Sequence, residues 1–149
     1  EKKDRVDDAL HATRAALEEG IVPGGGVTLL HAREVLKNDK NTGSQIVFNA
    51  CGKCFEQILL NAGYIQSDIF SISYQLVKLR KKNYWRGYNI QTEKVENLNE
   101  VGIIDPFKVT RTALQNAASI AGTILLTECI VVDDSEEKEE NANPMAGLM

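Results

Sequence analysis

Aromatic residues and histidine are scarce in this chain, and each scarcity excludes a kind of core or a kind of catalytic site. Aromatic side chains make up 6% of the sequence, so the core must be mainly aliphatic and rich in alanine, which favours packed helices. The two histidines fall in helical patterns, and the sequence shows no Ser–His–Asp set for nucleophilic catalysis. No apolar run approaches the ~18 residues that a membrane-spanning helix needs. We therefore expect one mainly α-helical unit and no membrane partner.

Charge is distributed unevenly, although the net charge is only −4. Residues 133–149 carry six acidic residues against one lysine, a net charge of −5, whereas residues 1–132 carry 16 basic and 15 acidic residues. The densest basic run, residues 78–86, is too short to form a nucleic-acid-binding face. We expect no nucleic-acid partner, and a disordered acidic tail over residues 134–149.

The cysteines are three in number, and two of them form the motif Cys51-Gly-Lys-Cys54. Such a pair is typical of redox sites and of half a zinc site. A zinc site needs four ligands, and the other soft candidates are scattered along the sequence: His11, His31 and Cys129. A thioredoxin-type pair should follow a strand and open a helix, whereas this pair lies inside an apolar-rich helical run. We expect small buried residues here; a redox protein is a distant alternative.

Apolar spacing predicts helices over residues 1–19, 27–36 and 46–60, with Gly52 as a candidate break, and a fourth helix capped by Ser67. Asp105 is a suitable N-cap, and Pro106 a suitable first residue, for a fifth helix that runs to about residue 124. Residues 83–92 are aromatic and β-prone around one glycine, which predicts a short hairpin. The polar segment 93–101 that follows is predicted to be irregular or a short helix. The apolar run 130–132 predicts an edge strand.

Two features of the first predicted helix bear on function. Glu18 and Glu19 lie in its last turn, where the helix dipole disfavours anions, so we expect them to have basic partners elsewhere in the chain. Asp8 lies about 200° around the helix from Val6 and Leu10, and it therefore points away from their apolar stripe. By pattern alone, Asp8 is a solvent-exposed carboxylate.

Three consecutive glycines, Gly24 to Gly26, stand at the start of the second predicted helix. Backbone without a Cβ can approach a ligand closely, and the free N–H groups and dipole of a helix N-terminus favour phosphate. The sequence thus offers a candidate phosphate site here, with a plain helix–helix loop as the alternative.

Several segments together, in order over about residues 1–133, resemble the group I chaperonins, the GroEL family. The most specific are EKKDRVDDALHATRAALEEG at residues 1–20 and GIIDP at residues 102–106; the others are the three glycines, Gly87-Tyr88-Asn89, KVTRTAL at 108–114 and Thr127-Glu128-Cys129. The resemblance implies a fold that is mainly α: a multi-helical half of a chaperonin equatorial (ATPase) domain with a small β-hairpin and a C-terminal edge strand. Residues 1–18 would end the intermediate domain, and residues 19–133 would form the C-terminal half of the equatorial nucleotide-binding domain.

The resemblance also implies an activity: an ATP-dependent chaperone that encloses non-native proteins and assists their refolding. Its partners would be further copies in stacked seven-membered rings, a cochaperonin and unfolded client proteins. It would work in the bacterial cytoplasm or in the matrix of a mitochondrion or plastid. The chain would be the last part of a subunit, and we expect it not to hydrolyse ATP alone, because most ligands of the Mg ion would lie in the N-terminal half.

The resemblance assigns roles to individual residues of the ATP site. Asp8 matches the carboxylate that activates the water attacking the γ-phosphate. The other matches contact the nucleotide: Gly24 and Gly25 by their backbone, Asn89, Ile90 and Gln91 at the adenine, Ile103 packing on the base, and Asp105 at the ribose. The family commonly has two alanines where this chain has Ile90 and Gln91, which leaves room for an alternative, a helical interaction or scaffold module without nucleotide turnover. A Gly-Asp-Gly-Thr-Thr-type loop encoded upstream of Glu1 would favour the ATPase.

Overall fold

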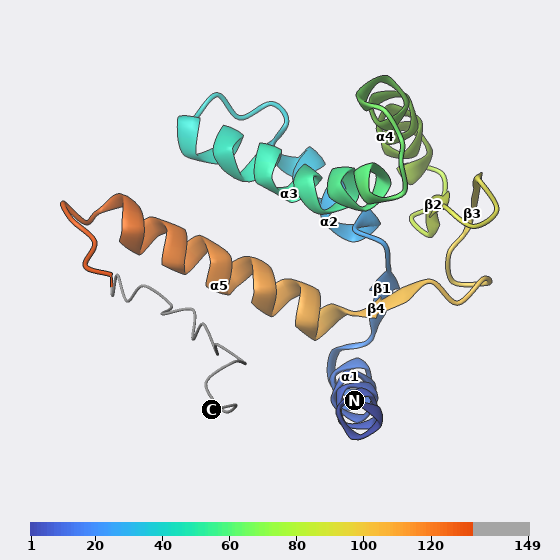
Figure 1. The fold of residues 1–149 in the computed structure, drawn as a ribbon. Helices are drawn as coiled ribbons and strands as arrows, with labels where there is room; N and C mark the ends of the chain where they lie inside the picture. The colour runs from blue at the N-terminus through green and yellow to red at the C-terminus, as the bar shows by residue number, and fades with distance from the viewer. Residues whose placement is uncertain (133–149) are drawn as a thin grey trace, which may run out of the picture.

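The computed structural model describes residues 1–132, which fold into helices and four short strands (Figure 1). The helices are α1 (Lys2–Glu19), α2 (Val27–Ala32), the 3-10 helix η1 (Arg33–Leu36), α3 (Thr42–Asn61), α4 (Gln66–Arg80) and α5 (Phe107–Leu125). The strands are β1 (Ile21–Pro23), β2 (Arg86–Asn89), β3 (Lys94–Asn97) and β4 (Ile104–Pro106). The mainly α fold predicted from the sequence is thereby confirmed. In the described residues, no helix is both long and apolar enough to cross a bilayer.

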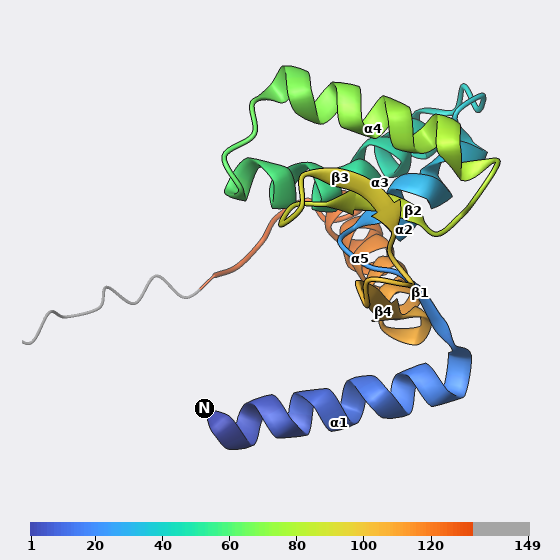
Figure 2. The same cartoon turned by 90° about the vertical axis from the view of Figure 1, so that its right-hand side faces the viewer.

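The core lies among α2, α3, α4 and the β2–β3 hairpin. Its buried side chains are aliphatic apart from one phenylalanine: Val27, Leu30, Phe55, Leu59, Ile69, Leu76 and Leu98. Both views of the ribbon place α2, α3, α4 and the hairpin on one side of the β1–β4 pair and α1 on the other (Figures 1 and 2). The core is therefore mainly aliphatic, as the scarcity of aromatic residues predicts, and its helices pack through leucine, isoleucine and valine.

Strands β1 and β4 bring together two parts of the sequence that lie more than 80 residues apart. They pair antiparallel, with Val22 opposite Asp105, and the N–H of Phe107 donates to the carbonyl of Gly20 at 3.0 Å. Because α1 ends just before β1 and α5 begins just after β4, the two long helices leave the core module from a common point (Figure 1).

The two glutamates that end α1 find their basic partners on α5, as the sequence predicts. Glu18 pairs with Lys108, and the carboxylate of Glu19 accepts hydrogen bonds from Arg111 at 3.0 Å from Nε and 2.6 Å from Nη2. The Arg111 guanidinium holds the pKa of the Glu19 carboxyl below its usual range. These pairs fix the end of α1 against the first turns of α5.

The remaining surfaces of α1 and α5 are open to solvent in the described chain. Their apolar side chains are exposed, including Val6, Leu10 and Leu17 on α1 and Val109, Ile120 and Ile124 on α5. The predicted apolar stripe of the first helix is therefore present, but none of the residues on it is buried by residues 1–132. The exposed apolar faces of α1 and α5 are suited to packing against further protein.

The predicted boundaries of α3 and α4 need correction. Helix α3 begins at Thr42, four residues before the predicted start, because the Asn41 side chain caps it by accepting from the N–H of Gly43 at 2.8 Å. Gly52 does not break this helix; its missing side chain makes room for the Arg33 guanidinium, which packs across it. Helix α4 begins at Gln66 with Ile65 at the N-cap, so the predicted Ser67 cap is wrong.

The β-structure also departs from the sequence-based expectations. The hairpin is confirmed, but its second strand, β3, lies in the segment predicted to be irregular or a short helix, so that prediction is wrong there. Asp105 does not cap α5, because it is drawn into β4 by pairing with β1, and Pro106 takes the N-cap position. Residues 130–132 form no strand and are exposed, since no strand of the described residues lies beside them. The predicted disorder of residues 134–149 concerns a segment outside the described residues.

His31 in α2 makes the stability of this module depend on pH. It is 1% exposed, and neither ring nitrogen has a hydrogen-bond partner within residues 1–132. Burial, and then the charge of Arg80, lowers the pKa of His31 from 6.5 to about 4. The unfolded chain therefore takes up this proton at a higher pH than the folded chain does. The contribution of the neutral His31 side chain to the free energy of unfolding is complete above about pH 6.5 and is lost as the pH falls towards 4.

We expect His31→Leu to remove most of this dependence, because leucine has a similar size and does not titrate. In the wild-type chain, His31 should lower the free energy of unfolding by about 3 kcal/mol between pH 6.5 and pH 4. Urea unfolding at a series of pH values measures this. His11→Leu, at an exposed position on α1, is the matched control and should keep the wild-type profile. An unchanged slope in His31→Leu would contradict the assignment.

Candidate functional site

A cavity of about 210 Å³ opens where the start of α2, the C-terminal half of α3 and the β2–β3 hairpin meet. Nine residues line it: Gly25, Phe55, Ile58, Leu59, Tyr88, Asn89, Ile90, Gln91 and Ile103. Five of these come from the sequence-predicted site, namely Gly25, Asn89, Ile90, Gln91 and Ile103. Most of the lining is apolar, with two side-chain amides at the hairpin, which is the usual character of a small-molecule site.

The glycine loop places Gly25 in the cavity wall, and its two neighbouring glycines pack closely against other segments. The N–H of Gly24 donates to the carbonyl of Ile103 at 3.0 Å, and a Cβ on Gly24 would lie 3.2 Å from that carbonyl group. A Cβ on Gly26 would lie 2.8 Å from the backbone nitrogen of Phe55 on α3. Between them, Gly25 has a left-handed φ of 64° and leaves its backbone beside the cavity. Bare backbone at the N-terminus of a helix is suited to anionic groups.

The hairpin wall is held by the side chain of Asn89, which is 7% exposed. Its Nδ2 donates to Glu96 on the paired strand at 3.0 Å, and its Oδ1 accepts from the N–H of Gln91 at 3.0 Å. The second bond is a local turn in which the asparagine side chain replaces a backbone carbonyl. Asn89 therefore fixes the shape of the turn that carries Ile90 and Gln91.

Four lining residues escaped the sequence analysis as site residues. Phe55, Ile58 and Leu59 come from one face of α3, where their apolar spacing predicts a helix but does not say what the face contacts. Tyr88 lies on β2, and its hydroxyl is 3.0 Å from the hydroxyl of Tyr64. That hydrogen bond, followed by burial, raises the pKa of Tyr88 to about 12, so its hydroxyl stays protonated at neutral pH.

Two predicted site residues lie away from this cavity. Asp105 is half-buried in β4 and faces a separate cavity of about 200 Å³ beside Thr13 and Ala16 of α1; burial raises the pKa of its carboxyl. Asp8 is an exposed residue of α1, and this helix lies on the far side of the β1–β4 pair from the hairpin (Figure 2). Gly24 is next to the cavity lining without being part of it.

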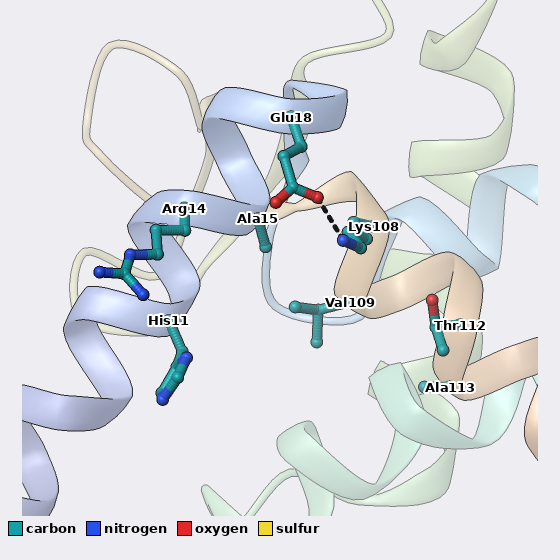
Figure 3. Close-up of a pocket in the computed structure, with 8 residues that line it drawn as sticks. All are labelled: His11, Arg14, Ala15, Glu18, Lys108, Val109, Thr112 and Ala113. Atoms are coloured by element: carbon teal, nitrogen blue, oxygen red, sulfur yellow. Dashed lines mark hydrogen bonds and ion pairs between the residues drawn. The ribbon is translucent and has the colours of Figure 1, made fainter.

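A third hollow, of about 430 Å³, lies between α1 and α5 (Figure 3). Charged and small residues line it: His11, Arg14, Ala15, Glu18, Lys108, Val109, Thr112 and Ala113. The Glu18–Lys108 pair closes one end of it, as the dashed line in Figure 3 marks. This hollow contains no residue of the sequence-predicted site, and two of its charged residues, Glu18 and Lys108, are paired with each other.

The cysteine pair lies in the middle of α3, whereas a thioredoxin-type pair would follow a strand at the start of a helix. Cys51 and Cys54 lie within α3 as free thiols, the first buried and the second exposed, and burial raises the pKa of Cys51. A raised pKa disfavours the thiolate that redox chemistry needs. Within residues 1–132, no three His, Cys, Asp or Glu side chains gather into a metal-binding group.

Comparison with known proteins places these features in a family context. Residues 1–135 match the sequence profile of the TCP-1/cpn60 chaperonin family. Among solved structures, the crystal structure of a group III chaperonin in the open state is similar, with a TM-score of 0.67 and 28% sequence identity. The similarity covers 78% of this chain and 25% of that one, so the chain spans about a quarter of the solved protein.

Proposed function

The chain belongs to the TCP-1/cpn60 chaperonin family, and from that premise we propose that it is the C-terminal part of an ATP-dependent chaperonin subunit that assists protein folding. In this proposal residues 1–18 end an intermediate domain and residues 19–133 belong to an equatorial, nucleotide-binding domain. Within the family we propose group I membership, which the segments at residues 1–20 and 102–106 support. Stacked seven-membered rings, a cochaperonin and unfolded client proteins are the partners that this membership implies.

The observation that carries the nucleotide role is the meeting of five predicted site residues around one cavity. Its lining includes the apolar residues Ile90 and Ile103, which are suited to pack on an adenine base. The bare backbone of Gly25 lies where a phosphate chain can approach a helix N-terminus. Gln91 adds a side-chain amide at the rim of the same cavity.

Asp105 and Asp8 are proposed to act from outside this cavity. Asp105, in the strand that follows Ile103, is proposed to hydrogen-bond the ribose. Asp8 is proposed to orient and activate the water that attacks the γ-phosphate, which requires α1 to move towards the nucleotide and its ion pairs with α5 to open. Gly20 is the one residue between α1 and β1, and its φ of 85° and ψ of −170° suit such a pivot.

Phosphoryl transfer depends on positioning and on charge stabilisation, with Mg supplying much of the latter. The chain's own contribution in this proposal is a base pocket, a backbone contact and a water-activating carboxylate. We propose that most Mg ligands belong to the N-terminal half of the subunit. Residues 1–149 alone should therefore show no measurable ATP hydrolysis.

Titration of the 149-residue chain with Mg-ATP, followed by amide NMR, tests the base pocket. We expect shifts clustered at Gly24–Gly26, Asn89–Gln91 and Asp105, with Mg-pyrophosphate shifting only the glycines. Absence of shifts from a well-dispersed spectrum, repeated with the full-length subunit, would favour the alternative, a scaffold module without nucleotide turnover.

A further inference from the structure

We propose that Tyr64 is a positioning residue for the 210 Å³ cavity: its hydroxyl holds Tyr88, and with it the hairpin wall, in place against the α3 wall. The proposal rests on the nucleotide role proposed above for that cavity. Tyr64 itself is outside the lining, so it would act on a bound nucleotide only through Tyr88.

Tyr64 is anchored to the α3 wall through its backbone. It follows Gly63, whose φ of 89° turns the chain sharply at the end of the helix. The N–H of Tyr64 donates to the carbonyl of Leu59 at 3.1 Å, and Leu59 is a fully buried lining residue of the cavity. The position of Tyr64 is thus set by the same turn of α3 that contributes Leu59 to the α3 wall of the cavity.

The side chain of Tyr64 then reaches the opposite wall. Its ring meets the ring of Tyr88 edge-on, with centroids 5.8 Å apart and planes at 89°, and the two hydroxyls are 3.0 Å apart. Edge-to-face packing and a hydrogen bond together define both the position and the tilt of the Tyr88 ring. Both side chains are half-buried, where such a bond competes less with water than it does on an open surface.

Tyr88 passes this constraint to the residues next to it in the cavity wall. Asn89, Ile90 and Gln91 follow it directly, and all three line the cavity. On its other side, Gly87 is packed against Leu98 of the core so closely that a Cβ would clash with that side chain. The backbone of β2 is therefore fixed at Gly87, and the Tyr64 contact fixes the next residue, from which the turn projects.

The test uses the full-length subunit and the dissociation constant of Mg-ADP, measured by calorimetry well below the melting temperature of every variant. Tyr64→Phe keeps the ring and removes the hydroxyl, so it should raise the dissociation constant about three- to ten-fold, which corresponds to the loss of one hydrogen bond. Tyr88→Phe should have an effect of the same size. The double variant should be no weaker than either single one, because the two hydroxyls act as a pair.

Tyr74→Phe is the matched control, because Tyr74 lies on the exposed side of α4 and stacks on Phe70, away from the cavity. It should bind Mg-ADP as the wild type does. The Tyr64→Phe variant should also return the pKa of Tyr88 from about 12 towards its ordinary value near 10, as followed by ultraviolet absorbance. A change in stability alone would move neither the Kd cycle nor this titration.

Wild-type affinity in Tyr64→Phe would overturn the proposal, and so would a loss that persists undiminished in the Tyr88→Phe background. Those results are distinct from failure of the nucleotide role itself, which would appear as no Mg-ADP binding by the wild-type subunit.

Discussion

Replacing Asp8 with alanine in the full-length subunit should slow ATP hydrolysis about 10²- to 10⁴-fold, the range expected for loss of a general base, while ATP remains bound. Asp8 is exposed on α1 and is not among the residues that line the cavity, so its loss should leave nucleotide binding intact while it removes the proposed water-activating group. A residue that does not hold the nucleotide in this geometry can contribute to turnover without contributing to affinity. Single-turnover hydrolysis and equilibrium binding of ATP, measured on the same preparation, separate the two quantities.

Asp7→Ala is the matched control for this experiment. Asp7 is also exposed, carries the same charge and lies about 100° further round the helix, so its loss changes the net charge equally without removing the proposed base. We expect Asp7→Ala to hydrolyse ATP within a few-fold of the wild-type rate. Weaker ATP binding in Asp8→Ala, with an unchanged rate of hydrolysis of the bound nucleotide, would refute the assigned role.

Gly26→Ala should be the most destabilising single substitution among the glycines of the loop. The residue has a left-handed φ of 75°, which costs an alanine about 1–2 kcal/mol. In addition, the new Cβ would lie 2.8 Å from the backbone nitrogen of Phe55, and the backbone of a packed helix cannot move aside as a side chain can. With about 1–3 kcal/mol for overpacking, we expect a total loss of about 2–5 kcal/mol in the free energy of unfolding. Urea unfolding of the 149-residue chain measures it.

Gly102→Ala isolates the contribution of the close approach. Gly102 has nearly the same φ, 74°, but a Cβ there would meet nothing within 4 Å. We expect Gly102→Ala to lower the free energy of unfolding by about 1–2 kcal/mol, the cost of the left-handed conformation alone. Equal losses for the two variants would show that α2 and α3 can separate at little cost, against the close packing described here.

The helices of this fold were predictable because their apolar spacing is a local property of the sequence. The partners of Glu18 and Glu19 were predictable in kind, since two anions at a helix C-terminus need cations, but nothing local identified Lys108 and Arg111. Asp105 shows the limit of local reasoning. An Asp-Pro pair before an apolar run is a strong cap signal, yet pairing with β1, more than 80 residues away, recruits Asp105 into a strand.

The second strand of the hairpin shows a different limit. The sequence around β2, with Tyr88 beside a glycine, predicts a strand. Strand β3 has the sequence Lys-Val-Glu-Asn, which is polar and has low β-propensity. It forms a strand because β2 offers it a ladder and because Glu96 accepts a hydrogen bond from Asn89. Such cross-strand contacts are not visible in either segment alone.

The candidate site was predictable only as far as motifs reach. Family resemblance supplied Gly25, Asn89, Ile90, Gln91 and Ile103, and the structure brings these five together. The α3 wall was not predictable, because helical periodicity gives a face without saying what lies opposite it. Tyr64 lies in the turn after α3 and Tyr88 lies on β2, so their contact depends on how the end of α3 packs against the hairpin.

The pairing of β1 with β4 gives the molecule a short mechanical path. Helix α1 joins β1 through a single residue, β1 is hydrogen-bonded to β4, and β4 continues directly into α5. The ion pairs of Glu18 and Glu19 tie the same two helices together beside the strands. Helices α1 and α5 are therefore joined by three paired strand residues and two ion pairs. The same strand pair also borders the cavity, because β1 leads into the glycine loop that carries Gly25, and Ile103 directly precedes β4.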